Sequence, residues 1–291
     1  MADEPPPAKR QRQSSPTEDT TPSRSHIWKP FGDIVLQAEA TQFRVNRDVL
    51  ATQSPVFADM FSVPQPPGEP LVDGCPLVLL SGDTTKGWEL LLGFLYGNPF
   101  EVEECLPFDV IAAMLRLGRK YGICTAEASA IRRIHWEFPT TLKTWSAHAR
   151  FKKIQKADGM LFDLLNLVHE FGINTTIPAL ALACLHDQTL EKILNGVPRF
   201  DGSRVTLAPN IARSLIIGFQ RVLAFQNKTY AWLDNDDVIP AGSCKQRSKC
   251  TKGRHALRGW LAWDEARDMP YFFGLIHWDP AWWDDVGICD A

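Results

Sequence analysis

The chain has 291 residues, of which 31 are Lys or Arg and 34 are Asp or Glu, so its formal net charge is −3. Its hydrophobic fraction of 45% is that of a globular protein, and the length is enough for one large domain or two ordinary ones. This charge balance excludes a protein that wraps nucleic acid with an overall basic surface. No apolar run approaches the roughly 20 residues that span a bilayer. The start MADEPPPAKR has acids and prolines where a secretory signal has its apolar core, which predicts an intracellular protein, nuclear or otherwise cytoplasmic.

Residues 1–30 differ in composition from the rest of the chain. They contain six prolines and almost no apolar residue before Ile27, so they cannot bury enough surface to offset the entropy of ordering. We therefore predict a disordered tail. Within it Lys9, Arg10 and Arg12 form a basic cluster behind prolines that resembles a nuclear-import signal, and the alternative is a solvated run of charge.

Strand and helix patterns alternate between residues 33 and 80. Residues 33–38 and 42–45 are β-prone runs on either side of a polar turn, which predicts a hairpin. An amphipathic stretch follows, with Asn46 available as its cap. Pro55 then starts a second helix, whose inner face holds Phe57 and either Met60 or Phe61. After a proline-rich loop over 64–76, residues 77–80 predict a third strand.

Three further helices are predicted before residue 138. Residues 82–84 cap the first of them, which ends at Tyr96 and Gly97. Pro107 begins the second, and Gly122 interrupts the pattern before a last helix from Thr125 to about Glu137.

This order of elements resembles the BTB/POZ domain family. The matching motifs are the hairpin Asp33–Leu36 with Phe43–Val45, the helical pair Val49–Phe61, and the later helices at Leu90–Gly97 and Leu115–Ile123. In closer detail the segments Phe43–Phe61, Pro76–Ser81 and Leu106–Ile123 resemble the large set of BTB-containing proteins of basidiomycete fungi. The resemblance implies an α+β fold class: a BTB/POZ fold, with a three-stranded sheet capped by helical hairpins, followed by an α-helical C-terminal domain. The predicted divisions are a tail at 1–30, the BTB/POZ-like domain at 31–137 and the helical, tryptophan-rich part at 138–291.

The resemblance implies a non-catalytic protein–protein interaction adaptor, acting in nuclear regulation or in the recruitment of ubiquitin-ligase substrates. Its expected partners are proteins, through weak homo-oligomerisation or hetero-pairing of the BTB-like domain, with neither a membrane nor nucleic acid involved. In such a fold the polar residues form turns and helix caps, so no acid, base and nucleophile come together in one site. We therefore predict no enzymatic activity and no cofactor, and assign no catalytic or metal-binding residue.

Three residues are candidates for partner contacts. Asp33 and Arg47 stand where the family often has an acidic and a basic residue facing a charged pocket at its dimer seam, and Asp48 follows them. The alternative is that these are ordinary surface charges.

Two departures from the family pattern bear on assembly. Strongly dimerising members have a long helix and a swapped strand ahead of the first core strand, whereas here only Ile27–Gly32 separates the predicted tail from Asp33. Members that recruit cullin scaffolds usually carry a hydrophobic residue two positions before a glutamate, where this chain has the proline-rich run Ser62–Glu69. Domain swapping is therefore not expected, and the resemblance leaves cullin binding open.

The C-terminal half carries helical apolar stripes over 161–171, from Pro178 to Leu185, and from Pro209 onward, with Asp187 as a cap for a helix through Leu194. Near its end five tryptophans gather, which predicts a packed aromatic cluster or an interface anchor: Trp260, Trp263, Trp278, Trp282 and Trp283.

Residues 241–258 hold the basic sequence AGSCKQRSKCTKGRHALR. Cys244, Cys250 and His255 raise a second hypothesis, a zinc-containing regulator associated with nucleic acid. Five residues separate the two cysteines, where two to four are usual in zinc sites, so Cys289 or His277 would have to complete the ligand set. The alternative is a flexible basic loop with ordinary thiols.

Overall fold

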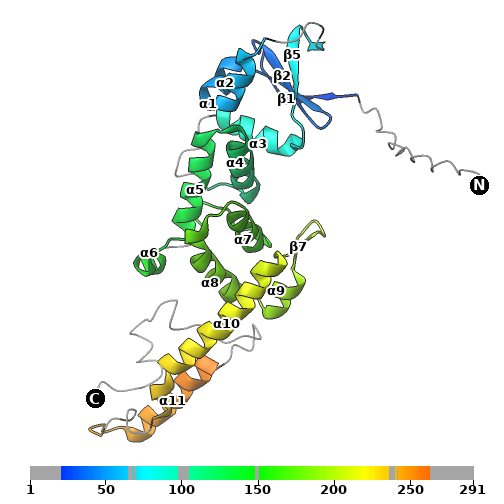
Figure 1. The fold of residues 1–291 in the computed structure, drawn as a ribbon. Coiled ribbons are helices and arrows are strands. Elements are labelled where there is room, and N and C mark those ends of the chain that lie inside the picture. Colours follow the sequence, from blue (N-terminus) through cyan, green and yellow to red (C-terminus); the bar gives the residue numbers. More distant parts are fainter. Residues whose placement is uncertain are drawn as a thin grey trace, which may run out of the picture. The chain divides into compact units, whose positions relative to one another are not determined.

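A computed structural model describes residues 21–64, 68, 70–97, 105–147, 151–235, 240 and 242–262, which are drawn as ribbon in Figure 1. The chain divides into two compact units, one ending at Glu89 and the other beginning at Leu90. The first unit is built on a sheet and the second is mainly helical, which confirms the predicted α+β class.

Unit 1 contains a five-stranded sheet in the order β1-β3-β2-β5-β4. Its strands are β1 (Ser23–Trp28), β2 (Ile34–Ala38), β3 (Thr41–Val45), β4 (Leu71–Val72) and β5 (Cys75–Leu79). The predicted hairpin is confirmed, because β2 pairs antiparallel with β3, and β5 joins β2 in parallel as the predicted third strand. The two outer strands, β1 and β4, are additional to the three that the sequence indicated.

Strand β1 corrects the prediction that residues 1–30 form a disordered tail throughout. Residues 23–28 pair in parallel with β3, and Ser25 and Ile27 are buried. Arg24 forms an ion pair of 2.8 Å with Asp73 and lies 4.6 Å from the centroid of the Trp28 ring. The strand is ordered by its ladder to β3 and by these side chains, which local composition does not reveal. Residues 1–20 lie outside the described residues.

Strand β4 pairs with β5 through a two-residue turn, in a region for which the sequence predicts a loop. Asp73 and Gly74 have φ values of 50° and 76° between β4 and β5. Two successive positive φ values are characteristic of the type I′ hairpin turn, for which Asp-Gly is a preferred sequence. The predicted loop over 64–76 is therefore wrong from Leu71 onward.

Helices α1 (Arg47–Gln53) and α2 (Pro55–Ser62) pack on each other, and α3 (Thr85–Tyr96) follows the sheet. The Ser54 hydroxyl caps α2 by accepting the Phe57 N–H at 3.1 Å. Phe57 is fully buried, with ring centroids 5.7 Å from Phe61 and 5.9 Å, edge-on, from Trp88. Of the two residues proposed to share a face with Phe57, Phe61 is therefore the inner one and Met60 lies outside.

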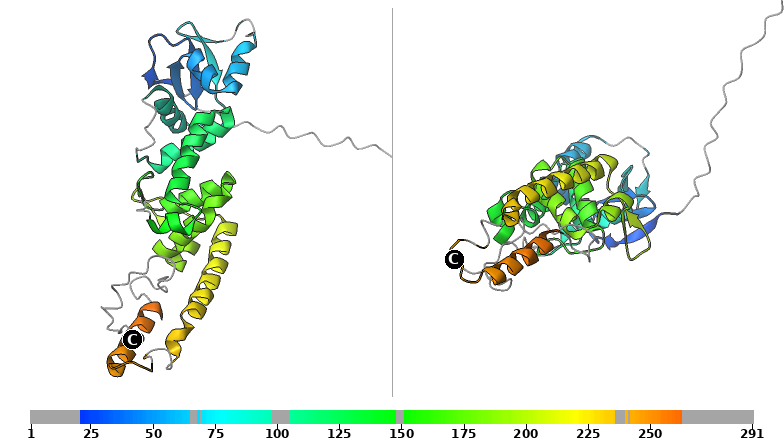
Figure 2. Two further views of the ribbon diagram at one scale, coloured as in Figure 1. Left: turned by 90° about the vertical axis from the view of Figure 1, so that its left-hand side faces the viewer. Right: turned by 90° about the horizontal axis from the view of Figure 1, so that it is seen from below.

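Figure 2 shows the helices of unit 2 from two further sides. They are α4 (Phe108–Tyr121), α5 (Cys124–Glu137), α6 (Leu142–Ala147), α7 (Met160–Glu170), α8 (Ile177–Asp187), α9 (Leu190–Asn195), α10 (Pro209–Thr229) and α11 (Arg247–Ala262). Short 3₁₀ turns lie at Asn174–Thr176 and Ala231–Asp234, and a small hairpin pairs β6 (Val197–Pro198) with β7 (Arg204–Val205). Helix α4 packs on α5 and α7 packs on α8. Gly122, at φ 65°, ends α4 where the sequence predicted a break.

Two predictions in unit 2 need correction. Asp187 does not cap the next helix, because α8 runs through it and Thr189 accepts the Lys192 N–H at 3.3 Å instead. The basic segment is no loop from Arg247 on, because Arg and Lys are good helix formers and α11 buries Cys250 and Leu257.

A buried carboxylate organises the chain around residues 151–154. Glu137, at the end of α5, is almost fully buried and accepts the backbone N–H groups of Phe151 at 2.7 Å and Ile154 at 3.1 Å, and also that of Lys153. Phe151 has a φ of 65°, which is uncommon for a non-glycine residue. Three donors to one carboxylate satisfy backbone groups that would otherwise be costly to bury.

Candidate interaction surface

Asp33 and Arg47 lie together, but not as an ion pair. One carboxylate oxygen of Asp33, just before β2, accepts the backbone N–H of Arg47 at 2.8 Å. Although both residues are in the described part of the chain, their side chains form no salt bridge with each other. The Arg47 guanidinium instead lies 5.5 Å from the centroid of the Phe61 ring. The Asp33 carboxylate thus accepts the first N–H of α1. The Arg47 side chain extends from α1 to the Phe61 ring of α2.

The turn before β2 is held against the start of α1. Asn46, predicted as the cap of α1, makes no side-chain cap and donates its Nδ2 to the carbonyl of Phe31 at 2.9 Å. The Phe31 side chain is almost fully exposed beside this contact. Asp48, in the first turn of α1, is also exposed, where a negative charge interacts favourably with a helix N-terminus.

Helix α2 directs apolar side chains outward. Val56 and Met60 lie one turn apart on α2 and Val63 directly follows its end, and 40%, 39% and 64% of their respective surfaces are exposed. We call Phe31 together with these three residues and the charged groups of Arg47 and Asp48 the α1–α2 face. Sequence reasoning missed its apolar part, because spacing alone does not show which side of a short helix faces outward.

The α1–α2 face rests on a fully packed interior. Beneath it, Leu50 and Phe57 have no exposed surface. The Trp88 ring nitrogen donates to the buried carboxylate of Asp83 at 2.9 Å. Buried polar groups that are paired in this way hold a core in one arrangement. The exposed side chains are therefore presented by a rigid base.

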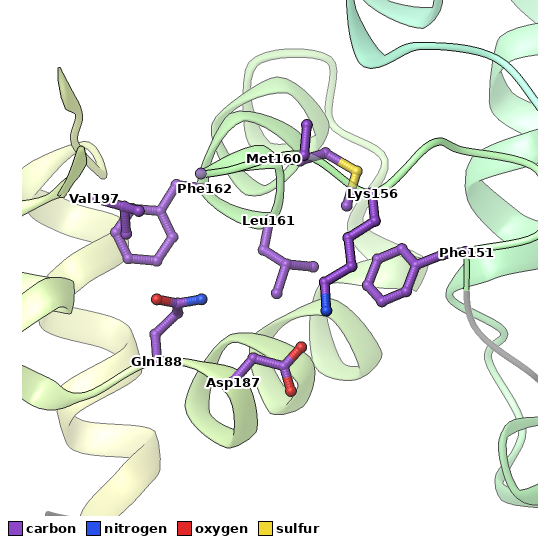
Figure 3. Close-up of a pocket in the computed structure, with 10 residues that line it drawn as sticks. Phe151, Lys156, Met160, Leu161, Phe162, Asp187, Gln188 and Val197 are labelled. Carbon is purple, nitrogen blue, oxygen red and sulfur yellow. The ribbon is translucent and has the colours of Figure 1, made fainter. Parts of the chain in front are cut away.

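Unit 2 contains a hollow of about 330 Å³. Figure 3 shows Leu161 and Phe162 from α7 on one side of it and Asp187 and Gln188 from the end of α8 on the other. A carboxylate oxygen of Asp187 lies 2.7 Å from Nδ1 of His186. Lys156 holds its ammonium group 5.5 Å from the Phe151 ring centroid. The ten lining residues include no hydroxyl or thiol side chain.

The three residues of the zinc hypothesis do not come together as a ligand set. Cys244 and Cys250 are in contact, but His255 is exposed on α11 while Cys250 is buried on the same helix. Within the described ranges no three His, Cys, Asp or Glu side chains are grouped as a metal site requires. Cys289 and His277 lie outside the described residues, as do the basic cluster Lys9–Arg12 and the tryptophans from Trp263 onward. Trp260 belongs to α11, with its side chain likewise undescribed.

The comparison with protein families agrees with this architecture. The model of the BTB/POZ domain matches residues 25–132, a stretch that begins inside β1 and ends inside α5. The chain therefore carries a BTB/POZ domain, a class of module that implies protein–protein interaction, followed by a mainly helical part. None of the curated proteins compared with the chain matches it. Of the helices that the structure describes, none combines the length and apolar character needed to cross a bilayer.

Proposed function

We propose that this protein is a non-catalytic adaptor that binds other proteins through the α1–α2 face of its BTB/POZ domain. The observation that carries the proposal is the outward apolar surface of α2 on a rigid, fully buried base. Exposed apolar side chains grouped in this way mark interaction sites more often than scattered ones do. Methionine and aromatic residues are also enriched in protein interfaces.

The charges around this surface would select the partner. Arg47 and Asp48 place opposite charges at the start of α1, and Asp33 fixes that start by its bond to the Arg47 N–H. Charges at the rim of an interface affect the rate and specificity of association more than its strength. A charge-reversing Asp48→Lys change should therefore alter partner choice and salt dependence while leaving the fold intact.

We infer that self-association is weak. The exposed apolar side chains of the face are Phe31, Val56, Met60 and Val63, which supply less area than the more than about 2,000 Å² buried in obligate interfaces. A micromolar dissociation constant fits a surface of this kind. It corresponds to a standard free energy of association of about −8 kcal/mol. Pairing with another BTB-like chain is the alternative use of the same face.

The setting of the adaptor is part of the proposal. Lys9, Arg10 and Arg12 support nuclear import, and the resemblance to basidiomycete BTB proteins supports a fungal source. Replacing the three cations with Ala should abolish nuclear enrichment of a fluorescent fusion, and an unchanged distribution would contradict the nuclear role. Recruitment of ubiquitin-ligase substrates requires a cullin contact, and the exposed Val63 beside the proline-rich run is where we would place it.

Affinity capture with the full chain as bait tests the adaptor role. Met60→Asp places a charge in the outward surface of α2, and Leu194→Asp does the same at a position of α9 that is 63% exposed. We expect Met60→Asp to lose the proteins that the unmodified chain retains, while Leu194→Asp keeps them. Equal retention by both variants would show that the α1–α2 face is not the binding surface.

A further inference from the structure

Two thiols are in direct contact near the start of α11. The Sγ atom of Cys244 donates to the Sγ atom of Cys250 at 3.4 Å, and both cysteines are reduced thiols in the structure. Cys244 keeps 8% of its surface exposed and Cys250 keeps 1%. A disulfide bond is about 2.05 Å long, so a small movement of two side chains would bring these sulfur atoms to bonding distance.

Local backbone structure brings the two cysteines together. Cys244 lies in the turn before α11, where its sulfur accepts the Gln246 N–H at 3.4 Å. Cys250 lies in the first turns of α11, and its N–H donates to the Gln246 carbonyl at 3.0 Å. Both contacts are made within one short segment. Hydrogen bonds within this segment therefore help to hold the two thiols together.

A bond between the two sulfur atoms needs fewer groups than a metal site does. Zinc takes four ligands, and the described residues supply no third His, Cys, Asp or Glu here. A dithiol needs only the two sulfur atoms and an oxidant that can reach one of them.

The surroundings are strongly cationic. Residues 242–262 contain six Lys or Arg and no Asp or Glu, in a chain whose net charge is −3. An open hollow of about 460 Å³ is lined by Lys245, Gln246, Arg247, Ser248, Lys249 and Lys252. Lys245 directly follows Cys244, and Lys249 directly precedes Cys250. An anionic small molecule is attracted to such a surface.

We propose that Cys244 and Cys250 form a reversible dithiol–disulfide site whose oxidant is an anionic disulfide of the glutathione type. Glutathione disulfide carries more carboxylates than ammonium groups, so the cations beside Cys244 favour its approach. Cys244 is the attacking residue because it is the more accessible of the two, and Cys250 is the resolving residue because it is in contact with Cys244 and shielded from solvent.

The exchange balances in two steps. The Cys244 thiolate, having released its proton to water, attacks one sulfur of glutathione disulfide; a mixed disulfide forms and one glutathione thiolate leaves. The Cys250 thiolate, after losing its proton, then attacks Sγ of Cys244; the protein disulfide forms and the second glutathione thiolate leaves. The two protons return to the two glutathione thiolates. The protein loses two electrons and two protons, and one glutathione disulfide becomes two reduced glutathiones.

Peptide mapping of the full chain tests the site. The chain is equilibrated with glutathione at increasing ratios of the disulfide to the thiol form, remaining thiols are alkylated, and the peptides are identified by mass spectrometry. We expect a Cys244–Cys250 disulfide to accumulate and to revert on return to reduced glutathione. Alkylation of both residues as thiols at every ratio would overturn the proposal.

Single variants test the assigned roles. Cys250→Ser should accumulate a lasting mixed disulfide at Cys244, because nothing resolves it, whereas Cys244→Ser should leave Cys250 largely unmodified. Exposed Cys124 is the internal control, since the described residues place no second cysteine sulfur within bonding reach of it, and it should form only a mixed disulfide. The opposite pattern, with Cys250 modified first, would overturn the assignment.

A charge test separates the cationic hollow from the thiols. The double change Lys245→Gln and Lys249→Gln should slow oxidation by glutathione disulfide several-fold. It should leave oxidation by the neutral reagent 2-hydroxyethyl disulfide unchanged. Equal slowing with both reagents, or slowing with neither, would show that the cations do not recruit the oxidant.

Discussion

Helices α2 and α11 place opposite kinds of side chain toward solvent. Helix α2 buries Phe57 and exposes Met60, whereas α11 buries Cys250 and Leu257 and exposes the cations Arg247, Lys249 and Lys252. An exposed apolar face is removed from water by contact with another protein. An exposed cationic face attracts anions and remains hydrated without a partner. The comparison shows why we assign protein binding to α2 and small-molecule redox chemistry to the start of α11.

The largest effect should come from the interior of unit 1. Phe57→Asp or Leu50→Asp would bury an unpaired charge where the side chain now has no exposed surface, at a cost on the order of 5 kcal/mol. We expect no cooperative thermal transition of unit 1 by circular dichroism in either variant. Met60→Asp, on the same helix but facing outward, is the matched control and should keep its transition. A cooperative transition of Phe57→Asp at the temperature of the unmodified chain would contradict the assignment of Phe57 to the buried side of α2.

A smaller effect should come from the buried carboxylate of unit 2. Glu137→Ala removes the acceptor of three backbone N–H groups, for which we expect a loss of about 2–4 kcal/mol in the free energy of unfolding. Hydrogen exchange at Phe151, Lys153 and Ile154 should accelerate in step. Glu170→Ala, which removes an exposed ion pair of 3.2 Å with Arg116, is the control and should cost less than about 1 kcal/mol. Similar losses in both variants would show that the Glu137 contacts do not hold this segment.

The smallest expected effect is on the pH dependence of the free energy of unfolding. Hydrogen bonds from the backbone N–H and then the hydroxyl of Thr85 hold the pKa of Glu39 below its ordinary value. The ionised carboxylate therefore stabilises the start of α3 above its ordinary pKa, and this contribution is lost as the pH falls through the lowered pKa. Urea unfolding between about pH 6 and pH 3 should show a slightly flatter pH dependence for Glu39→Gln than for the unmodified chain. The same pH dependence in both proteins would show that the Glu39 carboxylate does not stabilise the start of α3.

The sequence allowed the interior of unit 1 to be predicted because β2, β3 and α2 carry clear apolar patterns. It did not reveal β1, whose order depends on pairing with β3 and on the distant Asp73. The Asp73-Gly74 pair is a turn signal in the sequence, but the prolines around it favour the prediction of a loop. Patterns within one element are visible in a sequence, and stabilisation by another element is not.

The candidate sites show the same division. Asp33 lies near Arg47, but its partner is the backbone N–H and not the guanidinium, which lies over Phe61. Asn46 has the residue type of a helix cap, yet its amide bonds to Phe31. Cys244 and Cys250 stood out in the sequence, but their spacing along the chain does not show that their sulfur atoms lie 3.4 Å apart.

Light scattering of the full chain over a concentration series tests the adaptor account most directly. We predict a shift from monomer to dimer in the micromolar concentration range, which corresponds to a standard free energy of association of about −8 kcal/mol. Met60→Asp should move the shift to higher concentration, and Leu194→Asp should not. A dimer that persists at nanomolar concentration, or one that Met60→Asp leaves unchanged, would contradict the claim that the α1–α2 face is the interaction surface of this protein.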